Sequence, residues 1–248
     1  MRRRFSTVLA AAFILLLVWF LIAKLINLSL VPTPFAVAEN IGGIFMKDIA
    51  VHCAYSLLRI VLGLAAAIGV GVPLGVLMGA FPRADRLLSP LVYFAYPVPK
   101  IALLPIVLLV FGIGELSKAG LLFLILVFQI VLSVRDGVRG VPEEAFYPLR
   151  SLGASFWVML REVMLPAAMP GFLTALRVAM GTAVSVLFFT ETFGTQYGMG
   201  YFIMDAWLRV NYLEMYSGIV VLSILGLLIF GVLDFSGHRL CRWQERER

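Results

Sequence analysis

Six runs of predominantly apolar residues, each close to the length of a membrane span, constrain this chain more than any other feature. A helix needs about 20 such residues to cross the hydrocarbon core of a bilayer. Each run should be a helix, because lipid cannot satisfy an open sheet edge. We therefore predict an all-α membrane protein with about six transmembrane helices in a single domain, residues 1–248. The predicted spans are residues 8–28, 57–81, 87–111, 119–134, 172–193 and 217–235.

The composition and the placement of charge support this class. Hydrophobic residues make up 62% of the chain and charged residues only 14%, whereas a soluble domain needs a much more polar surface. The net charge of +6 reflects topology and not a nucleic-acid partner, because positive residues gather on the cytoplasmic side of membrane proteins. Lys47, Lys118 and Arg209 lie on the opposite side, so both termini should be cytoplasmic. The cytoplasmic set is Arg2, Arg3, Arg4, Arg83, Arg86, Arg135, Arg139, Arg150, Arg161, Arg239, Arg242, Arg246 and Arg248.

Residues suited to catalysis or metal binding are scarce. His52 and His238 are the only histidines and fall near opposite membrane faces. Neither a multi-histidine metal site nor a Ser-His or Cys-His pair within the membrane is therefore expected. No glycine loop followed by Lys-Ser or Lys-Thr is present to cradle phosphates, so the chain alone should not hydrolyse ATP. We predict no catalytic residue, no metal and no bound cofactor, which leaves transport or channel activity.

Prolines 90, 97, 99 and 105 interrupt the third run. Each removes a backbone donor and disturbs the preceding helical turn. Within a membrane such breaks persist only where protein or a water-filled cavity satisfies the freed carbonyls, and broken helices often line transport sites. Proline kinks also occur in packed bundles, so both interpretations stay open. The candidate residues of a translocation path are Tyr96, Pro97, Pro99, Lys100, Gln129, Phe188 and Glu191.

Some charged residues fall inside the predicted spans, where burying a charge costs at least ~2.5 kcal/mol. Arg59 and Arg177 lie just inside span ends, and we expect them to snorkel to lipid headgroups. Lys100 and Glu191 are expected in the bundle interior. There they pair with each other or face a wet passage.

The second predicted span carries Gly71, Gly75 and Gly79, spaced four residues apart on one helix face. This pattern lets two helix backbones approach closely. It indicates either packing within the chain or a contact between two copies of it.

The inner connection, residues 135–171, contains an elbow. The stretch VPEE at residues 141–144 is a good helix start, with proline at the first position and carboxylates in the first turn. Gly153 can end that helix, because glycine adopts the left-handed conformation without steric cost. Ser155 can cap a second helix, and Pro166 should stop it. The sequence thus predicts a cytoplasmic helix–bend–helix.

Phe156 and Trp157 on the second elbow helix suit either the membrane interface or a groove in a partner protein. The elbow also carries a spaced motif: Gly153, nine residues, Val163, one residue, then Leu165-Pro166. This motif resembles the cytoplasmic signature of bacterial ABC importer permeases, the membrane subunits that dock on an ATPase. The resemblance favours the partner groove.

Two further stretches, residues 100–118 and 191–207, resemble the nitrate/sulfonate/taurine branch of that family, in which some relatives carry pyrimidine vitamin precursors. The similarity covers residues 48–234. It implies a permease in the bacterial inner membrane that pairs with a second copy of itself, two ATPase subunits and an external solute-binding protein. ATP and Mg would be bound by the ATPases, and the solute would be small and anionic or polar.

In such a permease the two copies alternate between inward-facing and outward-facing states, and the outer loop, residues 194–216, serves as a gate. The family signature begins with Glu-Ala-Ala, where this chain has Tyr147, Pro148 and Leu149. We expect Pro148 to kink the first elbow helix in its last turn and a half. The residues implied in ATPase coupling are Tyr147, Pro148, Arg150, Gly153, Ala154, Ser155, Phe156, Trp157, Arg161, Glu162, Leu165 and Pro166.

Two other functions are compatible with a helical membrane chain of this kind. An ion-driven secondary transporter would use Glu191 as its proton carrier and would work without ATP. A structural subunit that anchors a complex would tolerate changes to the prolines of the third span.

Overall fold

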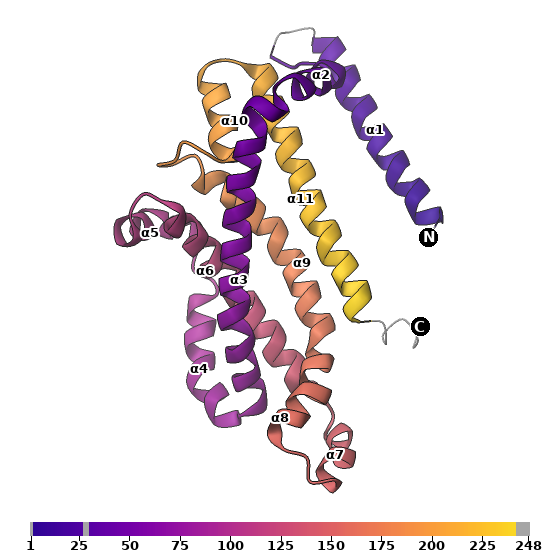
Figure 1. Ribbon diagram of the computed structural model, residues 1–248, viewed down its shortest axis with the longest axis vertical. Coiled ribbons are helices and arrows are strands. Elements are labelled where there is room, and N and C mark those ends of the chain that lie inside the picture. The colour runs from indigo at the N-terminus through magenta and orange to yellow at the C-terminus, as the bar shows by residue number, and fades with distance from the viewer. Residues whose placement is uncertain (1, 27–29, 242–248) are drawn as a thin grey trace. The chain divides into compact units, whose positions relative to one another are not determined.

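The computed structural model describes residues 2–26 and 30–241. Every regular element within these residues is helical (Figure 1). The chain forms two compact units. The first unit comprises residues 1–56 and 191–225, and the second comprises residues 57–190 and 226–248. Three positions of the predicted basic set, Arg242, Arg246 and Arg248, lie outside the described residues, as does the end of the first predicted span.

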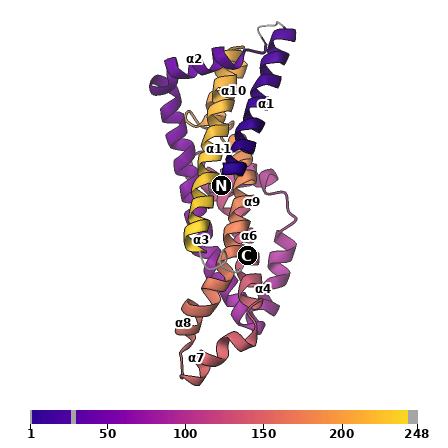
Figure 2. The ribbon, with the colours of Figure 1, turned by 90° about the vertical axis from the view of Figure 1, so that its right-hand side faces the viewer.

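The first unit contains α1 (Arg2–Ile26), α2 (Pro34–Ile44) and α10 (Met199–Leu208), and it shares α3 and α11 with the second. Its α2 lies across the direction of α1 (Figure 2). The helix begins at Pro34, and the Thr33 side chain accepts a hydrogen bond from the Ala36 amide at 3.4 Å. Both features are typical of helix starts.

Side-chain contacts join the helices of the first unit. Asn40 on α2 donates to the Ser217 hydroxyl on α11 at 2.9 Å. Trp19 on α1 stacks on Tyr216, with ring centroids 6.0 Å apart. These contacts between residues far apart in the sequence join α1 and α2 to α11.

The second unit is built on α6, whose apolar side chains are the most deeply buried of its helices. Leu126 and Ile130 on α6 pack in one core with Met180 and Leu187 on α9. The elements of this unit run in chain order. They are α3 (Ala50–Ala80), α4 (Pro82–Ala95), a 3-10 turn (Lys100–Leu103), α5 (Leu104–Phe111), α6 (Glu115–Arg139), a second 3-10 turn (Glu143–Phe146), α7 (Tyr147–Ser151), α8 (Phe156–Met159), a π-turn (Leu160–Met164), α9 (Leu165–Thr190) and α11 (Tyr212–Leu240).

The number of apolar helices agrees approximately with the six predicted spans. Four continuous helical stretches are long and apolar enough to cross a membrane: Pro34–Ala80, Glu115–Arg139, Phe156–Thr190 and Tyr212–Leu240. The third predicted span forms a fifth, bent one, and α1 adds a shorter apolar segment, Ala10–Ile26. All four stretches extend beyond the predicted boundaries at one end or both, because helical turns continue into the connections.

The glycine stripe of α3 packs against α6 of the same chain. A Cβ atom on Gly71 would lie 2.7 Å from the Ile130 side chain, and one on Gly79 would lie 2.7 Å from Val138. Real Cβ atoms do not approach so closely, so only glycine permits this helix separation. Gly63 extends the stripe by two further turns, since its Cβ would lie 2.6 Å from Leu122.

We expect Gly75→Ala to lower the stability of the second unit. Its Cβ would lie 2.7 Å from the Val134 side chain and 2.8 Å from the Val131 carbonyl oxygen, and overpacking of this kind costs about 1–3 kcal/mol. Gly69→Ala is the matched control, because a Cβ there meets nothing within 4 Å. Thermal unfolding of each purified variant in lipid nanodiscs gives the two midpoints to be compared. Equal midpoints for the two variants would contradict the close approach.

Candidate functional site

The break in the third predicted span lies between α4 and the 3-10 turn at Lys100. The two halves, Pro82–Ala95 and Lys100–Phe111, are bent by 83° relative to each other. Pro97 and Pro99 occupy the break itself. In a continuous helix the Lys100 amide would bond the Tyr96 carbonyl; here the Lys100 ammonium donates to that carbonyl. A cation thus satisfies the freed carbonyl group at the end of α4, where helix carbonyls attract positive charge.

Two cavities in the second unit lie beside this break. The smaller has a volume of about 320 Å³, and the larger, which is more open, has a volume of about 640 Å³. Tyr96 and Gln129 line both, so the structure brings together three candidate path residues: Tyr96, Lys100 and Gln129. Phe188 and Glu191 line neither cavity.

Polar groups in the smaller cavity are sparsely satisfied. The Gln129 amide oxygen is buried, and no described residue donates a hydrogen bond to it. The Lys100 ammonium lies 5.3 Å from the ring centroid of Phe128 and 5.2 Å from that of Tyr96. Such cation–π contacts partly stabilise a charge away from water. The cavity is therefore lined by one cation, Lys100, and by Gln129, whose amide oxygen has no donor among the described residues.

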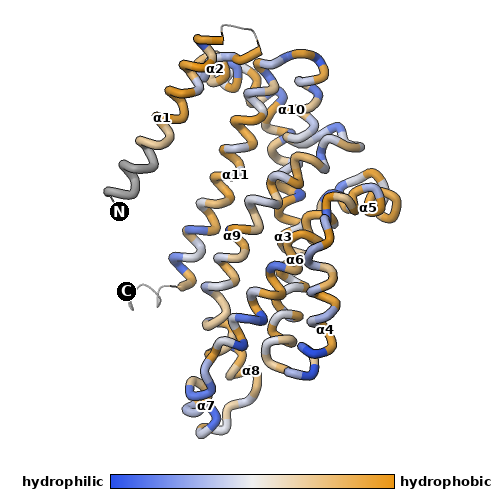
Figure 3. The backbone as a smooth tube through the Cα atoms, turned by 180° about the vertical axis from the view of Figure 1, so that it is seen from behind, coloured by the Kyte–Doolittle hydropathy of each residue, from blue (hydrophilic) through white to orange (hydrophobic). Residues whose placement is uncertain are grey.

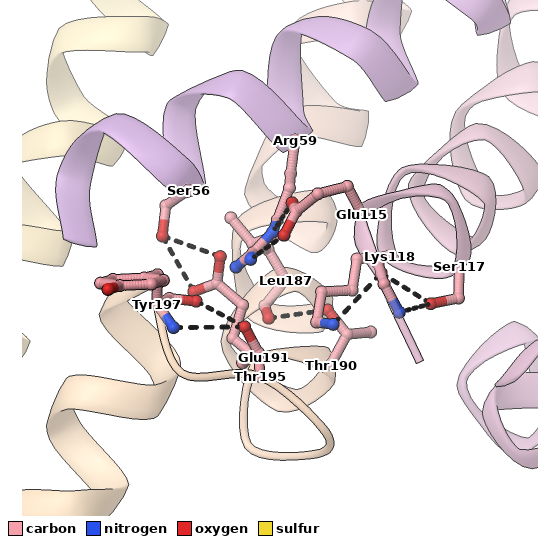
Figure 4. Close-up of polar contacts among 12 residues, drawn as sticks. Ser56, Arg59, Glu115, Ser117, Lys118, Leu187, Thr190, Glu191, Thr195 and Tyr197 are labelled. Carbon is pink, nitrogen blue, oxygen red and sulfur yellow. Dashed lines mark hydrogen bonds and ion pairs between the residues drawn. The ribbon is translucent and has the colours of Figure 1, made fainter. Parts of the chain in front are cut away.

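The expectation that Arg59 snorkels to a headgroup was wrong. Arg59 is fully buried on α3 and forms a bidentate ion pair with Glu115 at the start of α6 (Figure 4). Its Nε lies 2.5 Å from Oε2 and its Nη2 lies 2.7 Å from Oε1. The paired fork geometry of guanidinium and carboxylate offsets the desolvation of the charge. Arg177, the other residue expected to snorkel, is half-buried and pairs with Asp234 on α11.

Glu191 lies in the first unit as a cap for α10, and its carboxylate is completely buried. It accepts a hydrogen bond from the Ser56 hydroxyl at 2.8 Å (Figure 4). It also accepts one from the Gly200 amide at 2.9 Å. The Ser56 oxygen in turn accepts from the Met199 amide at 2.8 Å, and His52 Nδ1 accepts from the Gly198 amide at 3.1 Å.

Three consecutive amides at the start of α10 are therefore bonded by side chains. Orphan amides at a helix start need such partners when they are buried. Sequence reasoning missed His52 and Ser56 in this role. Their spacing of four residues on one helix face was the available signal.

A polar cluster joins α4 to α6, and the sequence analysis had used its arginines only for topology. Arg139 donates to Asp85 at 2.8 Å. The largely buried Arg135 donates to the Ser89 and Tyr93 hydroxyls, each at 3.3 Å. The first half of the broken span is thereby fixed to the helix that leads into the elbow.

The first half of the elbow ends as predicted at Gly153, which has φ +71°. The Gly153 amide donates to the Arg150 carbonyl and the Ala154 amide to the Leu149 carbonyl, both at 3.0 Å. This pair of bonds is the Schellman motif. Pro148 does not kink a continuous helix, which corrects the prediction. The helix divides into a 3-10 turn and α7, and Pro148 occupies the first turn of α7, where no donor is needed.

The second half of the elbow continues into the long apolar helix α9, which also corrects the prediction. Ser155 occupies the N-cap position of α8 without a side-chain hydrogen bond. The helix then passes through the π-turn Leu160–Met164, in which the Leu165 amide bonds the Leu160 carbonyl, into α9. Pro166 does not stop it, because it lies in the first turn after the widened π-turn, which accommodates a residue without an amide donor.

The tip of the elbow exposes large side chains. Trp157 is 73% exposed and Leu152 is 81% exposed, whereas α7 itself is largely hydrophilic (Figure 3). Phe156 packs on Phe81, with ring centroids 5.4 Å apart. The charged neighbours Arg161 and Glu162 are also exposed. The elbow thus presents apolar side chains with charged residues nearby, on a base anchored by Phe156.

Comparison with known proteins assigns the chain to a family. Residues 71–247 match the family described as the binding-protein-dependent transport system inner membrane component. The chain belongs to this family. It is the membrane-spanning permease subunit of an ABC importer, as the resemblance had predicted.

Similar proteins that are named as transport permeases support this assignment. The chain is 34% identical to the taurine transport system permease protein TauC of Escherichia coli, over 93% of this chain and 86% of the relative. It is 28% identical to the Bacillus subtilis protein named "putative aliphatic sulfonates transport permease protein SsuC", over 93% of this chain and 85% of the relative. It is 29% identical to the formylaminopyrimidine transport permease protein ThiX of Halalkalibacterium halodurans, over the full length of both.

Solved structures share the fold. A methionine ABC transporter, MetNI, in an inward-facing conformation matches with a TM-score of 0.61 and 22% identity, over 82% of this chain and 97% of that one. A bacterial ABC transporter involved in alginate import matches with a TM-score of 0.65 and 13% identity, over 95% and 96%. These likenesses support the all-α permease architecture.

Proposed function

We propose that this permease moves a small anionic or polar solute by alternating access, driven by two partner ATPases. The exposed elbow carries the proposal. Trp157 and Leu152 offer an apolar contact to a partner, and α8 continues through the π-turn into α9. A movement imposed on Trp157 would therefore pass into α9, whose Thr174 and Thr182 line the two cavities.

The permease works in a complex with partner proteins and has one orientation in the membrane. The partner ATPases bind ATP and Mg and perform the hydrolysis, while this chain contributes no catalytic group. A second copy of the chain completes the passage, both termini are cytoplasmic, and lipid covers the remaining apolar surface. An external binding protein delivers the solute to residues 198–216, where Trp207, Tyr212 and Tyr216 form the landing surface and α10 the gate.

The names of the relatives and the charges of this chain both support the proposed class of solute. Relatives are named for taurine, aliphatic sulfonates and formylaminopyrimidine, of which the first two are acids. Within the chain, Arg59 and Arg177 are already paired with carboxylates, so their charges contribute little to the attraction of an anionic solute. Lys100 supports an anionic or polar solute.

The deciding experiment is a mild-detergent purification of the tagged permease from its native membrane, with partners identified by mass spectrometry. We expect one ATPase subunit per permease. Crosslinking through Ser155→Cys, in a chain with Cys53→Ser and Cys241→Ser, should join the elbow to that ATPase. A permease recovered alone in both experiments would refute the proposal.

Glu191→Gln distinguishes an importer from a proton-driven carrier. We expect uptake to stay within about threefold of the wild type, because the amide oxygen can still accept one hydrogen bond from Gly200 or Ser56. Gly153→Pro should lose most uptake, because proline cannot adopt the φ of +71° found at Gly153. Uptake assays in proteoliposomes with and without ATP measure both. Abolished uptake in Glu191→Gln with normal folding would favour the carrier.

A further inference from the structure

Lys100 differs from other cations of the second unit in its partners. Arg59, Arg135 and Arg177 each form an ion pair with a carboxylate. Lys100 contacts the Tyr96 carbonyl and two aromatic rings, and no carboxylate among the described residues lies within ion-pair distance of it. Lys100 lies in a bent pair of apolar helices that together qualify as a membrane span, and a cation there without a carboxylate partner attracts an anion from outside the chain.

Gln129 also lines the cavity that holds Lys100, and its amide oxygen is buried without a hydrogen-bond donor among the described residues. A buried acceptor is unfavourable until a donor reaches it. The space of about 320 Å³ is near the lower end of the range for small-molecule sites. Its apolar wall consists of Ile101, Ile125, Phe128 and Val186.

We propose that Lys100 and Gln129 form a substrate site within the permease itself. Its ligand is a small organic acid that also carries an N–H or O–H donor on a short apolar body. Lys100 binds the acidic group, Gln129 Oε1 accepts from the donor, and the Phe128 side of the cavity contacts the carbon chain. The proposal rests on the transport function proposed above and adds a selecting step after delivery. Tyr96 and Gln129 also line the larger cavity, so the proposed site borders the space into which the ligand would move next.

A purely structural role for Lys100 predicts different behaviour. In that role its ammonium only satisfies the Tyr96 carbonyl at the end of α4. Lys100→Gln distinguishes the structural role from the substrate-binding role, because the glutamine amide still offers a donor to that carbonyl but carries no charge. Lys100→Arg retains both the donor and the charge. Lys47→Gln, at an exposed lysine of the first unit, controls for a general change of net charge.

The test measures binding of three probes to the permease–ATPase complex in nanodiscs by saturation-transfer NMR. Taurine carries an acid and a donor, ethanesulfonate only the acid, and ethanolamine no acid. We expect taurine to bind at least about tenfold more tightly than either of the others. Lys100→Gln should weaken taurine binding by about ten- to a hundredfold, while Lys100→Arg and Lys47→Gln stay within about threefold. Gln129→Leu should remove the advantage of taurine over ethanesulfonate.

Two results would overturn the proposal. Wild-type affinity for taurine in Lys100→Gln would make Lys100 a helix-end residue only. Taurine binding no tighter than ethanesulfonate or ethanolamine, or not at all, would exclude the inferred solute class. In either case the complex would still assemble and hydrolyse ATP, whereas failure of the proposed function would appear as a permease without an ATPase.

Discussion

Trp157→Ala is expected to weaken binding of the partner ATPase by about 30-fold or more while leaving the permease folded. Truncating a tryptophan at the centre of a protein interface typically costs at least about 2 kcal/mol. Trp157 is 73% exposed, so its removal takes little from the core. Its neighbour Phe156, packed on Phe81, keeps the elbow anchored. Copurification and titration of the ATPase onto the permease in nanodiscs provide the measurement.

The chain offers a matched control for this change. Trp207 on α10 is also exposed, at 51%, but belongs to the first unit. Trp207→Ala should leave ATPase binding unchanged. Equal binding by the two variants would show that the elbow tip is not the contact and would favour a membrane-interface role for Trp157.

Glu115→Leu is expected to destabilise the protein by about 2–3 kcal/mol. The substitution removes two charge-assisted hydrogen bonds from the fully buried Arg59. Arg59→Met should cost less, because the Glu115 side chain is 41% exposed and can be hydrated in its absence. The double variant should resemble Arg59→Met, since it leaves no buried guanidinium. Unfolding of the four proteins in one detergent gives the complete double-mutant cycle.

An exposed pair serves as the control for that cycle. Asp205→Ala breaks an ion pair with Arg209 on the surface of the first unit, and exposed pairs contribute about 0.2–1 kcal/mol. If Glu115→Leu were no more destabilising than Asp205→Ala, the Arg59–Glu115 pair would contribute no more to stability than an exposed ion pair. A double variant less stable than either single variant would show that the destabilisation does not come from a buried guanidinium left without its carboxylate.

Local features of the sequence predicted local features of the structure. The run of prolines predicted the break between α4 and α5, because a missing amide disturbs the adjacent turn wherever the helix lies. Gly153 predicted the end of α7, because its left-handed conformation depends on the residue itself. The apolar runs predicted the helical membrane class. The spaced motif around Gly153 identified the family.

Long-range pairing could not be predicted in the same way. Arg59 and Glu115 are 56 positions apart, and nothing local distinguishes a paired arginine from one that snorkels. Pro166 was expected to stop a helix, yet the preceding π-turn accommodates it. Glu191 looked like a charge facing a passage, but packing of α10 against α3 makes it a helix cap.

The sequence by itself determined the helices, their interruptions and the family, because those depend on backbone preference, hydrophobicity and spacing along the chain. Only the tertiary structure decided which charges are already paired. It placed Lys100 and Gln129 in one cavity while giving Arg59 and Arg177 carboxylate partners. The physical reason is that the cost of a charge within a membrane depends on what surrounds it. Those surroundings come from helices distant in the sequence.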